Sequence, residues 1–261
     1  MKPMATRLLA GCFVAWSLAG CATPQKPDPL EPVNRKIYAF NDTVDRAVLK
    51  PVATVYKDNV PQPVRTGVTN FFGNVKDVWS AVNLFLQGRV GDGFSDLMRF
   101  GTNTVFGVFG VFDVATDLGM PKHGEDLGQT LGRWGVGPGA YLVLPFFGPS
   151  TVRDVTDLPF DLQASPTGFV DRIPVRNSLT ATGIVNTRAN LLSAGDLMDE
   201  IALDKYVFLR DAYLQRRLSL VYDGHPPAQP EDSFDDDATD DADEPPAPAA
   251  VAPAASAASS P

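Results

Sequence analysis

The chain has 261 residues and a formal net charge of −9, but this charge is unevenly distributed. Nine of its 31 acidic residues lie between Pro226 and Pro261, where there is no lysine or arginine. Two of its 22 basic residues, Lys2 and Arg7, lie in the first ten positions, so the residues between carry a charge of only about −2. A nearly neutral body argues against nucleic-acid binding, which needs a concentrated basic surface.

The N-terminus has the pattern of a bacterial export signal. Lys2 and Arg7 precede an apolar run of twelve residues, Leu8–Ala19, which is too short to span a bilayer but has the length of a signal-peptide core. The run ends in Leu18-Ala19-Gly20-Cys21, which resembles the bacterial lipobox. We therefore expect residues 1–20 to be cleaved and Cys21 to carry diacylglycerol and a further acyl chain such as palmitate. The alternative is an ordinary signal peptide that happens to end near a cysteine.

The residue after the cysteine bears on the location. Ala22 stands where an aspartate would favour retention in the inner membrane, so we expect a lipid-anchored protein on the periplasmic face of the outer membrane. Cys12 leaves with the signal peptide, and acylation would consume the thiol of Cys21. No cysteine is then left for a disulfide, although the periplasm allows one.

Composition divides the rest into three parts. Residues 21–27 read as a lipidated linker, and residues 28–224 are long enough for one domain with a core. Residues 225–261 are rich in proline, alanine, serine and acid, a composition typical of disorder. An acidic docking arm is the functional alternative for this tail.

The clearest periodic segment is an amphipathic helix predicted from Val64 to Leu86. At 100° per residue its large apolar residues fall within an arc of about 140°, and its polar residues occupy the other side, with Leu84 as the exception. The apolar side holds Val64, Val68, Phe71, Phe72, Val75, Val78, Trp79, Val82, Phe85 and Leu86. The polar side includes Asn70, Asn74, Lys76, Asp77 and Ser80.

A second helix is predicted from about Gly91, leading into the glycine-punctuated apolar run Val105–Phe112. Eight of the sixteen phenylalanines lie between Phe71 and Phe112. They could form an ordinary core or an interfacial wedge in one membrane leaflet. On the wedge interpretation, the membrane-facing residues are expected to be Phe71, Phe72, Trp79, Phe85, Phe106, Phe109 and Phe112.

The remaining segments favour an all-α domain with an extended glycine- and proline-rich middle. Helices are predicted at about 178–193 and from Asp204, a plausible N-cap residue, to Gly224. Between them and the first two helices, Tyr141–Leu144 is a short strand-like run surrounded by glycine and proline.

Catalytic and metal-binding patterns are missing from the sequence. It has two histidines, His123 and His225, no G-x-S-x-G elbow and no Walker motif. Gly135–Ala140 formally matches G-x-G-x-x-A, but a strand-like run rather than a helix follows it. Glu125-Asp126 and Arg153-Asp154 are interpreted as surface ion pairs or caps. We therefore expect no enzyme activity, no metal and no cofactor.

Five segments together resemble the MlaA (VacJ) family of outer-membrane phospholipid-transport lipoproteins. The most specific runs from Gly132-Arg133-Trp134-Gly135 through Leu144-Pro145 to Gly148-Pro149-Ser150 and Arg153-Asp154. The others are residues 28–41, beginning Asp-Pro-Leu-Glu-Pro-Val-Asn-Arg, and residues 60–65, 83–88 and 99–104. They occur in family order across the whole body. Val33 and Ala140 depart from the usual aromatic and proline, and the acidic tail is an addition.

The resemblance implies a ring of amphipathic helices lying in one leaflet of the outer membrane around an amphipathic channel. Members remove phospholipids misplaced in the outer leaflet and pass them to a soluble periplasmic carrier that feeds an inner-membrane ABC complex. They also associate with trimeric porins. On this model the polar side of the first amphipathic helix, with Asn70, Asn74, Asp77 and Ser80, would face a hydrated channel.

The family also has a hairpin that affects channel opening, which here maps to about Phe40–Val48 and includes Asn41 and Asp42. The alternative function is a structural lipoprotein that scaffolds a porin without moving lipid.

Overall fold

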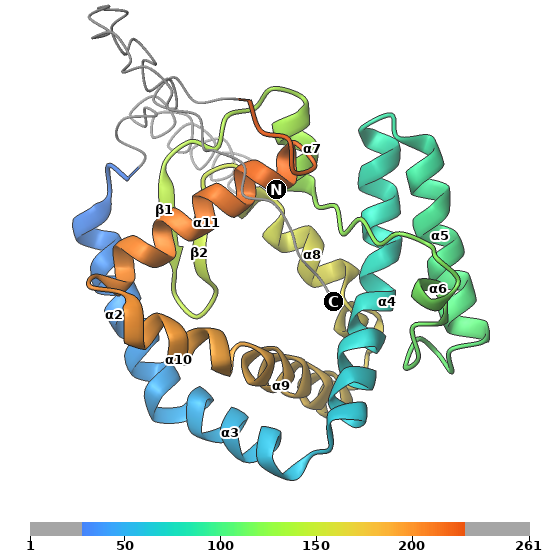
Figure 1. Ribbon diagram of the computed structural model, residues 1–261, viewed down its shortest axis with the longest axis horizontal. Coiled ribbons are helices and arrows are strands. Elements are labelled where there is room, and N and C mark those ends of the chain that lie inside the picture. The colour runs from blue at the N-terminus through green and yellow to red at the C-terminus, as the bar shows by residue number, and fades with distance from the viewer. Residues whose placement is uncertain (1–27, 228–261) are drawn as a thin grey trace, which may run out of the picture. The chain divides into compact units, whose positions relative to one another are not determined.

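A computed structural model describes residues 28–227 of the chain (Figure 1). The predicted signal peptide, Cys21, the linker and the tail from residue 228 onward lie outside the described residues. Most of the described residues are helical, which confirms the prediction of a mostly helical domain.

The described part contains a series of helices and one pair of strands. The α-helices are α2 (Glu31–Val44), α3 (Lys50–Asn59), α4 (Gln62–Leu86), α5 (Val90–Val105), α6 (Val114–Asp117), α7 (Leu127–Arg133), α8 (Leu158–Ala164), α9 (Ile173–Asn190), α10 (Leu192–Ile201) and α11 (Lys205–Val221). The other helical segments are the π-helix η1 (Asp45–Leu49) and the 3-10 helices η2 (Asp154–Thr156) and η3 (Pro166–Phe169). The strands are β1 (Tyr141–Leu144) and β2 (Gly148–Thr151).

The ends of α4 follow from local chemistry. Pro61 is the N-cap residue and Pro63 stands in the first turn, where the missing N–H costs no helical hydrogen bond. The helix therefore begins at Gln62, two residues before its predicted start. Gly88 follows the other end with a φ of +78°, a left-handed conformation that glycine adopts without strain.

The C-terminal helices also match their sequence signals. Asp204 caps α11 as predicted, because its carboxylate accepts hydrogen bonds from the backbone N–H groups of Tyr206 and Val207. The helix predicted at about 178–193 is α9, which begins earlier, with Pro174 in its first turn.

The strand-like run predicted at Tyr141–Leu144 is β1, and it pairs with β2 in an antiparallel hairpin. Tyr141 is opposite Thr151, and Leu144 is opposite Gly148. Phe146 in the connecting turn has a φ of +66°, and Gly148 after it has a φ of +82°. This hairpin is the extended middle segment of an otherwise helical domain.

Within residues 28–226 the elements pack in a closed circuit (Figure 1). Helix α2 contacts β1, β2 contacts α11, and α11 contacts α7. Helix α7 then contacts α4, α4 contacts α9, and α9 contacts α3, which continues the helical path from α2 through η1. Helix α5 packs against α4 from outside this circuit (Figure 1). The circuit agrees with the ring of helices that the family resemblance implied.

Asn34 fastens the start of the circuit to the strand hairpin. Its side-chain amide donates hydrogen bonds to Asp28 Oδ1 at 2.8 Å and to the carbonyl oxygen of Tyr141 at 3.0 Å. Its amide oxygen accepts one from the backbone N–H of Val143 at 3.0 Å. Asn34 is buried, so these three bonds satisfy groups that water cannot reach.

We predict that Asn34→Ala lowers the free energy of unfolding by about 2 kcal/mol, because it leaves buried backbone groups of β1 without partners. Urea unfolding of the purified protein measures the change. Asn59→Ala is the matched control, since its amide makes an exposed hydrogen bond to Val55. Equal stability of the two variants would contradict this role for Asn34.

Candidate functional site

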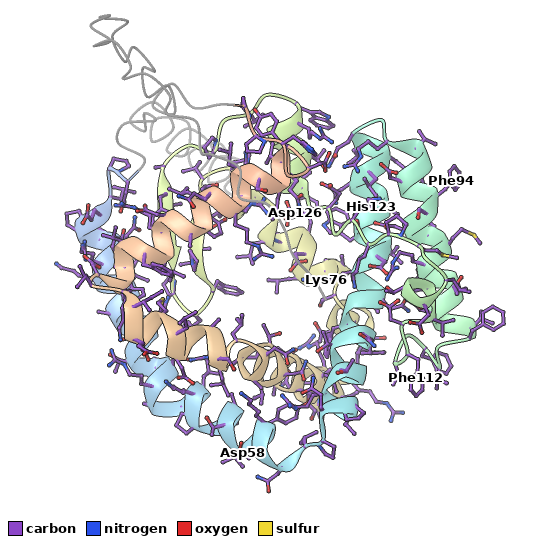
Figure 2. The ribbon with its side chains drawn as sticks, in the orientation of Figure 1. Asp58, Lys76, Phe94, Phe112, His123 and Asp126 are labelled. Carbon is purple, nitrogen blue, oxygen red and sulfur yellow. The ribbon has the colours of Figure 1, made fainter. Side chains whose placement is uncertain are left out.

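The run Val105–Phe112 forms an exposed apolar surface at the end of α5, called here the phenylalanine tip. Phe106 and Phe109 are each 72% exposed and Phe112 is 61% exposed. Figure 2 shows Phe94 on the outer side of α5 and Phe112 in the loop beyond the end of α5. An exposed apolar patch of this kind marks a surface that contacts lipid or another protein. The core interpretation of these three phenylalanines is therefore wrong.

Backbone geometry holds the phenylalanine tip in this conformation. Val108 and Phe109 have φ values of +52° and +56°, a left-handed conformation that costs residues with a Cβ about 1–3 kcal/mol each. Gly107 makes the turn possible, because a Cβ there would collide with the carbonyl oxygens of Phe112 and Asn103. The Asn70 side chain supports the turn by donating to the carbonyl oxygen of Val111 at 3.1 Å.

The other predicted membrane-facing residues, which lie on α4, are half-buried and pack within the molecule. Trp79 stacks on Phe160 of α8, with ring centroids 6.0 Å apart. Phe85 meets Phe94 of α5 edge to face at 5.4 Å, and Phe72 lies against Gly183 of α9. Phe71 meets Phe72 edge to face at 5.5 Å.

Three residues of the polar side of α4, Asn74, Asp77 and Ser80, do not face water, contrary to the prediction that they would face a hydrated channel. All three are buried where α4 packs on α5. Asn74 donates to Thr104 Oγ1 at 3.0 Å, and Ser80 donates to Asp96 Oδ2 at 2.5 Å. Sequence periodicity identified which residues share a face of α4. It could not decide whether that face contacts water or the polar face of another helix.

Arg99 and Asp77 form the charged part of this interface. The Arg99 side chain is fully buried, with its Nε 3.5 Å from Asp77 Oδ2. It also donates to Asp113 Oδ1 at 2.9 Å and to the carbonyl oxygen of Met120. Burial raises the pKa of Asp77 to about 6, although Lys122 and Arg99 act in the opposite direction.

The predicted gating hairpin at Phe40–Val48 is helical, so this assignment of secondary structure is wrong. Residues 40–44 end α2 and residues 45–48 lie in the π-helix η1. The hairpin in this region is β1–β2, and its turn contacts the predicted residues. Asn41 donates to the carbonyl oxygen of Leu144 and accepts from the backbone N–H of Phe146, both at 2.9 Å. Phe40 meets Phe146 edge to face at 5.3 Å.

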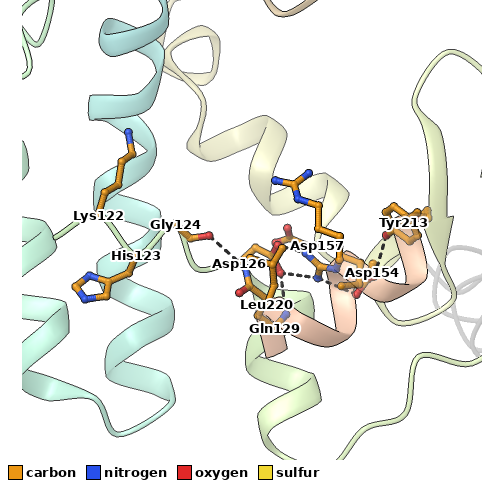
Figure 3. A pocket seen from close by; sticks show the side chains of 12 residues that line it. Lys122, His123, Gly124, Asp126, Gln129, Asp154, Asp157, Tyr213 and Leu220 are labelled. Atoms are coloured by element: carbon orange, nitrogen blue, oxygen red, sulfur yellow. Dashed lines mark hydrogen bonds and ion pairs between the residues drawn. The ribbon is translucent and has the colours of Figure 1, made fainter. Parts of the chain in front are cut away.

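Two polar clefts lie beside α7 and α11, and Figure 3 shows the larger one. The larger has a volume of about 600 Å³ and the smaller about 270 Å³, and they share Lys122, His123, Gln129 and Leu220. The larger cleft is also lined by Gly124, Asp126, Ser150, Asp154, Asp157, Tyr213, Arg216 and Arg217. The smaller is also lined by Arg89, Glu125, Ser219, Asp223 and Gly224.

Three charged residues of the larger cleft, Asp126, Asp154 and Arg217, neutralise one another. Arg217 donates to both carboxylate oxygens of Asp126, at 2.6 and 3.0 Å, and to Asp154 Oδ1 at 3.0 Å. Tyr213 donates to the other oxygen of Asp154 at 2.9 Å. Burial alone would raise the pKa of both carboxyls, but hydrogen bonds and charge from Arg217 lower each pKa below its ordinary value.

Asp157 is the exception on this side of the cleft. Burial, followed by the nearby Asp126 carboxylate, raises the pKa of Asp157 to about 6. Figure 3 shows Lys122 and His123 on one side of the cleft and Asp154, Asp157 and Tyr213 on the other. The His123 ring is held by Asp96, with Nδ1 2.8 Å from Oδ1.

Sequence reasoning missed this cleft. It interpreted Asp126 and Arg153-Asp154 as surface ion pairs or caps, and Asp126 does cap α7 by accepting from Gln129 N–H at 2.7 Å. Arg153 and Asp154 do pair, at 2.9 Å, but they are buried rather than on the surface. Arg217, the other partner of Asp154, is 63 residues further on, a separation that no local pattern connects.

The fold and the site define a class: a helical protein with polar groups packed inside, an apolar outer surface and charged clefts. The family model described as MlaA lipoprotein matches residues 26–219, so the chain belongs to the MlaA lipoprotein family, as predicted.

Individual relatives agree. The chain is 38% identical over 226 residues to the intermembrane phospholipid transport system lipoprotein MlaA of Escherichia coli (strain K12), an alignment that covers 82% of this chain and 84% of that protein. It is 32% identical over 230 residues to the protein of the same name from Haemophilus influenzae, covering 83% and 91%. A solved structure described as "Structural basis for maintenance of bacterial outer membrane lipid asymmetry" matches with a TM-score of 0.65 and 34% identity, covering 74% of this chain and 98% of that one.

We predict that Phe109→Asp weakens binding to phospholipid vesicles and leaves stability almost unchanged, because this side chain is exposed in the protein alone. Losing one buried phenylalanine from the lipid phase costs about 1.5–3 kcal/mol, or roughly tenfold or more in partitioning. Vesicle co-sedimentation measures the binding. Asp58→Asn, an exposed substitution at the end of α3, is the control, and unchanged sedimentation of Phe109→Asp would rule out lipid contact at the tip.

A second prediction concerns pH. The pKa of Asp77 rises on folding from about 3.8 to about 6, so the native state binds more protons than the unfolded state between these values. The Asp77 contribution to the free energy of unfolding therefore decreases as pH rises from 4 to 6. Asp77→Asn should gain stability relative to wild type across this window, as measured by urea unfolding at each pH. A constant difference would show that Asp77 does not titrate there.

Proposed function

We propose that this protein removes misplaced phospholipids from the outer leaflet of the outer membrane and passes them toward a soluble periplasmic carrier. This would be retrograde transport between membranes, and it would maintain the lipid asymmetry of the outer membrane. The observation that carries the proposal is the combination of an apolar outer surface with charged clefts in a member of the MlaA lipoprotein family. The names of the relatives from Escherichia coli and Haemophilus influenzae support it.

Lipid transfer imposes a physical requirement that this arrangement could meet. Exposing about 30 lipid methylenes to water costs on the order of 24 kcal/mol, at about 0.8 kcal/mol per methylene. A transfer route must therefore shelter the acyl chains while it solvates the headgroup. Here the exposed apolar side chains would meet the acyl chains, and the clefts would accept the polar headgroup. The sequence carries no Walker motif, so we infer that the carrier and its inner-membrane ABC complex set the direction.

The seating of the protein is part of the same proposal. No helix among residues 28–227 is long and apolar enough to cross a membrane. We infer that acylated Cys21 anchors the protein at the periplasmic face of the outer membrane. The exposed residues Phe106, Phe109 and Phe112 would then enter one leaflet, beside a trimeric porin partner.

We further infer that the β1–β2 hairpin and Phe40–Asn41 of α2 act together as the gating element. The two hydrogen bonds of Asn41 and the edge-to-face contact of Phe40 with Phe146 join the hairpin turn to α2. Asp42, which pairs with Arg46 of η1, would support this end of α2 rather than contact the hairpin.

Photocrosslinking tests lipid transport against porin scaffolding. A photoreactive residue at position 220, which lines both clefts, should capture phospholipid in cells if lipid passes through them. Position 94 is exposed on the outer side of α5 and should capture phospholipid on either model, so it is the positive control. Capture at position 94 but never at position 220 would favour a membrane-seated scaffold.

Deletion of the gene provides the cellular test. Cells without the protein should accumulate phosphatidylethanolamine in the outer leaflet, detected with a membrane-impermeant amine reagent, and should become sensitive to detergent and chelator. The wild-type gene should restore both properties. Unchanged outer-leaflet labelling in the deletion strain would contradict a role in lipid removal.

A further inference from the structure

Lys122 differs from Arg89 and Arg217, two of the arginines around the clefts. It is the only lysine or arginine, among the described residues, that lines both clefts. Arg217 is bonded to Asp126 and Asp154. Arg89 of the smaller cleft is bonded to Asp92, Glu125 and Asp223. Each of these two arginines thus neutralises protein carboxylates, whereas Lys122 makes no hydrogen bond to a described carboxylate.

The ammonium group of Lys122 lies close to a carboxylate but donates no hydrogen bond to it. Its Nζ lies 3.7 Å from Asp77 Oδ1, beyond hydrogen-bonding distance, and its side chain is 44% exposed. Asp77 is buried, and neither of its carboxylate oxygens has a hydrogen-bond partner among the described residues. Asp77 thus attracts the ammonium group toward α4 without occupying its donors.

Gly73 provides the space in which Lys122 lies. A Cβ built on Gly73 would stand 2.6 Å from Lys122 Nζ and 3.9 Å from its Cε. The end of the lysine side chain therefore lies directly over a helical glycine of α4, one turn before Asp77. Any larger residue at position 73 would push the ammonium group away from this position. Gly73 is thus a positioning residue for the charge of Lys122.

We propose that Lys122, held over Gly73 at the junction of the two clefts, binds the phosphate oxyanion of a phospholipid headgroup. An ammonium group with free donors forms charge-assisted hydrogen bonds with a phosphate oxygen. The clefts supply room for the headgroup. Arg89 and Arg217 are neutralised by protein carboxylates in the way just described, and Arg216 lines only the larger cleft. The inference rests on the proposed lipid transport and names the group that would select the headgroup during it.

Binding measurements on the full acylated protein in maltoside detergent test the site. The probes are dihexanoylphosphatidylethanolamine, dihexanoylphosphatidylglycerol and inorganic phosphate, titrated calorimetrically. Lys122→Gln and Gly73→Ala should each weaken binding of both lipids about tenfold, the loss expected for one charged hydrogen bond. Lys122→Arg should retain binding. Both lipids should bind more tightly than inorganic phosphate, which lacks the glycerol backbone and chains.

Gly73→Ala separates positioning from folding. Alanine favours a helix interior over glycine by about 1 kcal/mol, so this variant should be at least as stable as wild type while it binds lipid less well. Gly101→Ala on α5 is the matched control, because a Cβ there meets nothing within 4 Å, and it should bind lipid like wild type. The Gly73→Ala result keeps the test valid even if Lys122→Gln destabilises the α4–α5 interface.

Two outcomes would overturn the proposal. Wild-type affinity in both Lys122→Gln and stable Gly73→Ala would remove Lys122 from the site. Inorganic phosphate binding as tightly as the lipids, with the same dependence on Lys122, would identify a free-phosphate site instead. In either case phospholipid capture at position 220 would still occur if the protein transports lipid, so failure of this site and failure of the transport proposal remain distinguishable.

Discussion

Arg99 is a guanidinium group with no exposure to solvent, and the arrangement of α4 and α5 depends on how it is satisfied. A buried charge is tolerated only when partners surround it, and here Asp77 of α4 and Asp113 at the start of α6 lie within ion-pair distance. Asp113 also caps α6 through Thr116, which joins the segment after the phenylalanine tip to the same network. The polar sides of α4 and α5 therefore pack against each other.

This packing of polar side on polar side determines which residues form the outer surface. Because α4 and α5 turn polar residues toward each other, most of their large apolar residues lie half-buried or exposed, as Trp79 and Phe94 do, and fully buried Leu84 is an exception. The buried apolar clusters are correspondingly small, and one consists of Ala53, Ala189 and Leu192 with Tyr56 packed against it. A water-soluble domain normally does the reverse, since burial of apolar area is the main driving force of folding. A lipid environment would supply the missing apolar contacts.

Charged residues of the larger cleft are likewise satisfied by pairing with one another. Asp126, Asp154 and Arg217 sit close together in partly buried positions, where an unpaired charge would be costly. Their mutual hydrogen bonds remove most of that cost and also connect α7, η2 and α11 across the closed circuit. Lys122 stands apart because its nearest carboxylate, Asp77, belongs to the α4–α5 interface rather than to the cleft. One buried carboxylate thus connects the helix pair that forms the apolar exterior with the cation at the clefts.

Local patterns in the sequence determined the helices and their ends. The 3.6-residue period of apolar residues predicted α4, and proline and glycine marked its two ends. Asp204, as an N-cap residue, predicted the start of α11. The run Tyr141–Leu144 was correctly taken as a strand, and the ordered motifs of the body identified the family. Each of these depends on residues near one another in the chain, where backbone geometry and short-range hydrogen bonding act.

Only the tertiary structure decided which environment each helix face meets. Periodicity placed Asn74, Asp77 and Ser80 on one side of α4. A polar helix face can meet either water or another polar face, and here it meets α5. The same limit applies to Phe40–Val48, which is helix rather than hairpin, and to Arg217, which meets Asp126 from 91 residues away. The local sequence shows the polarity of a helix face. Whether the residues of that face are buried, and with which residues they pair, depends on the distant segment that packs against it.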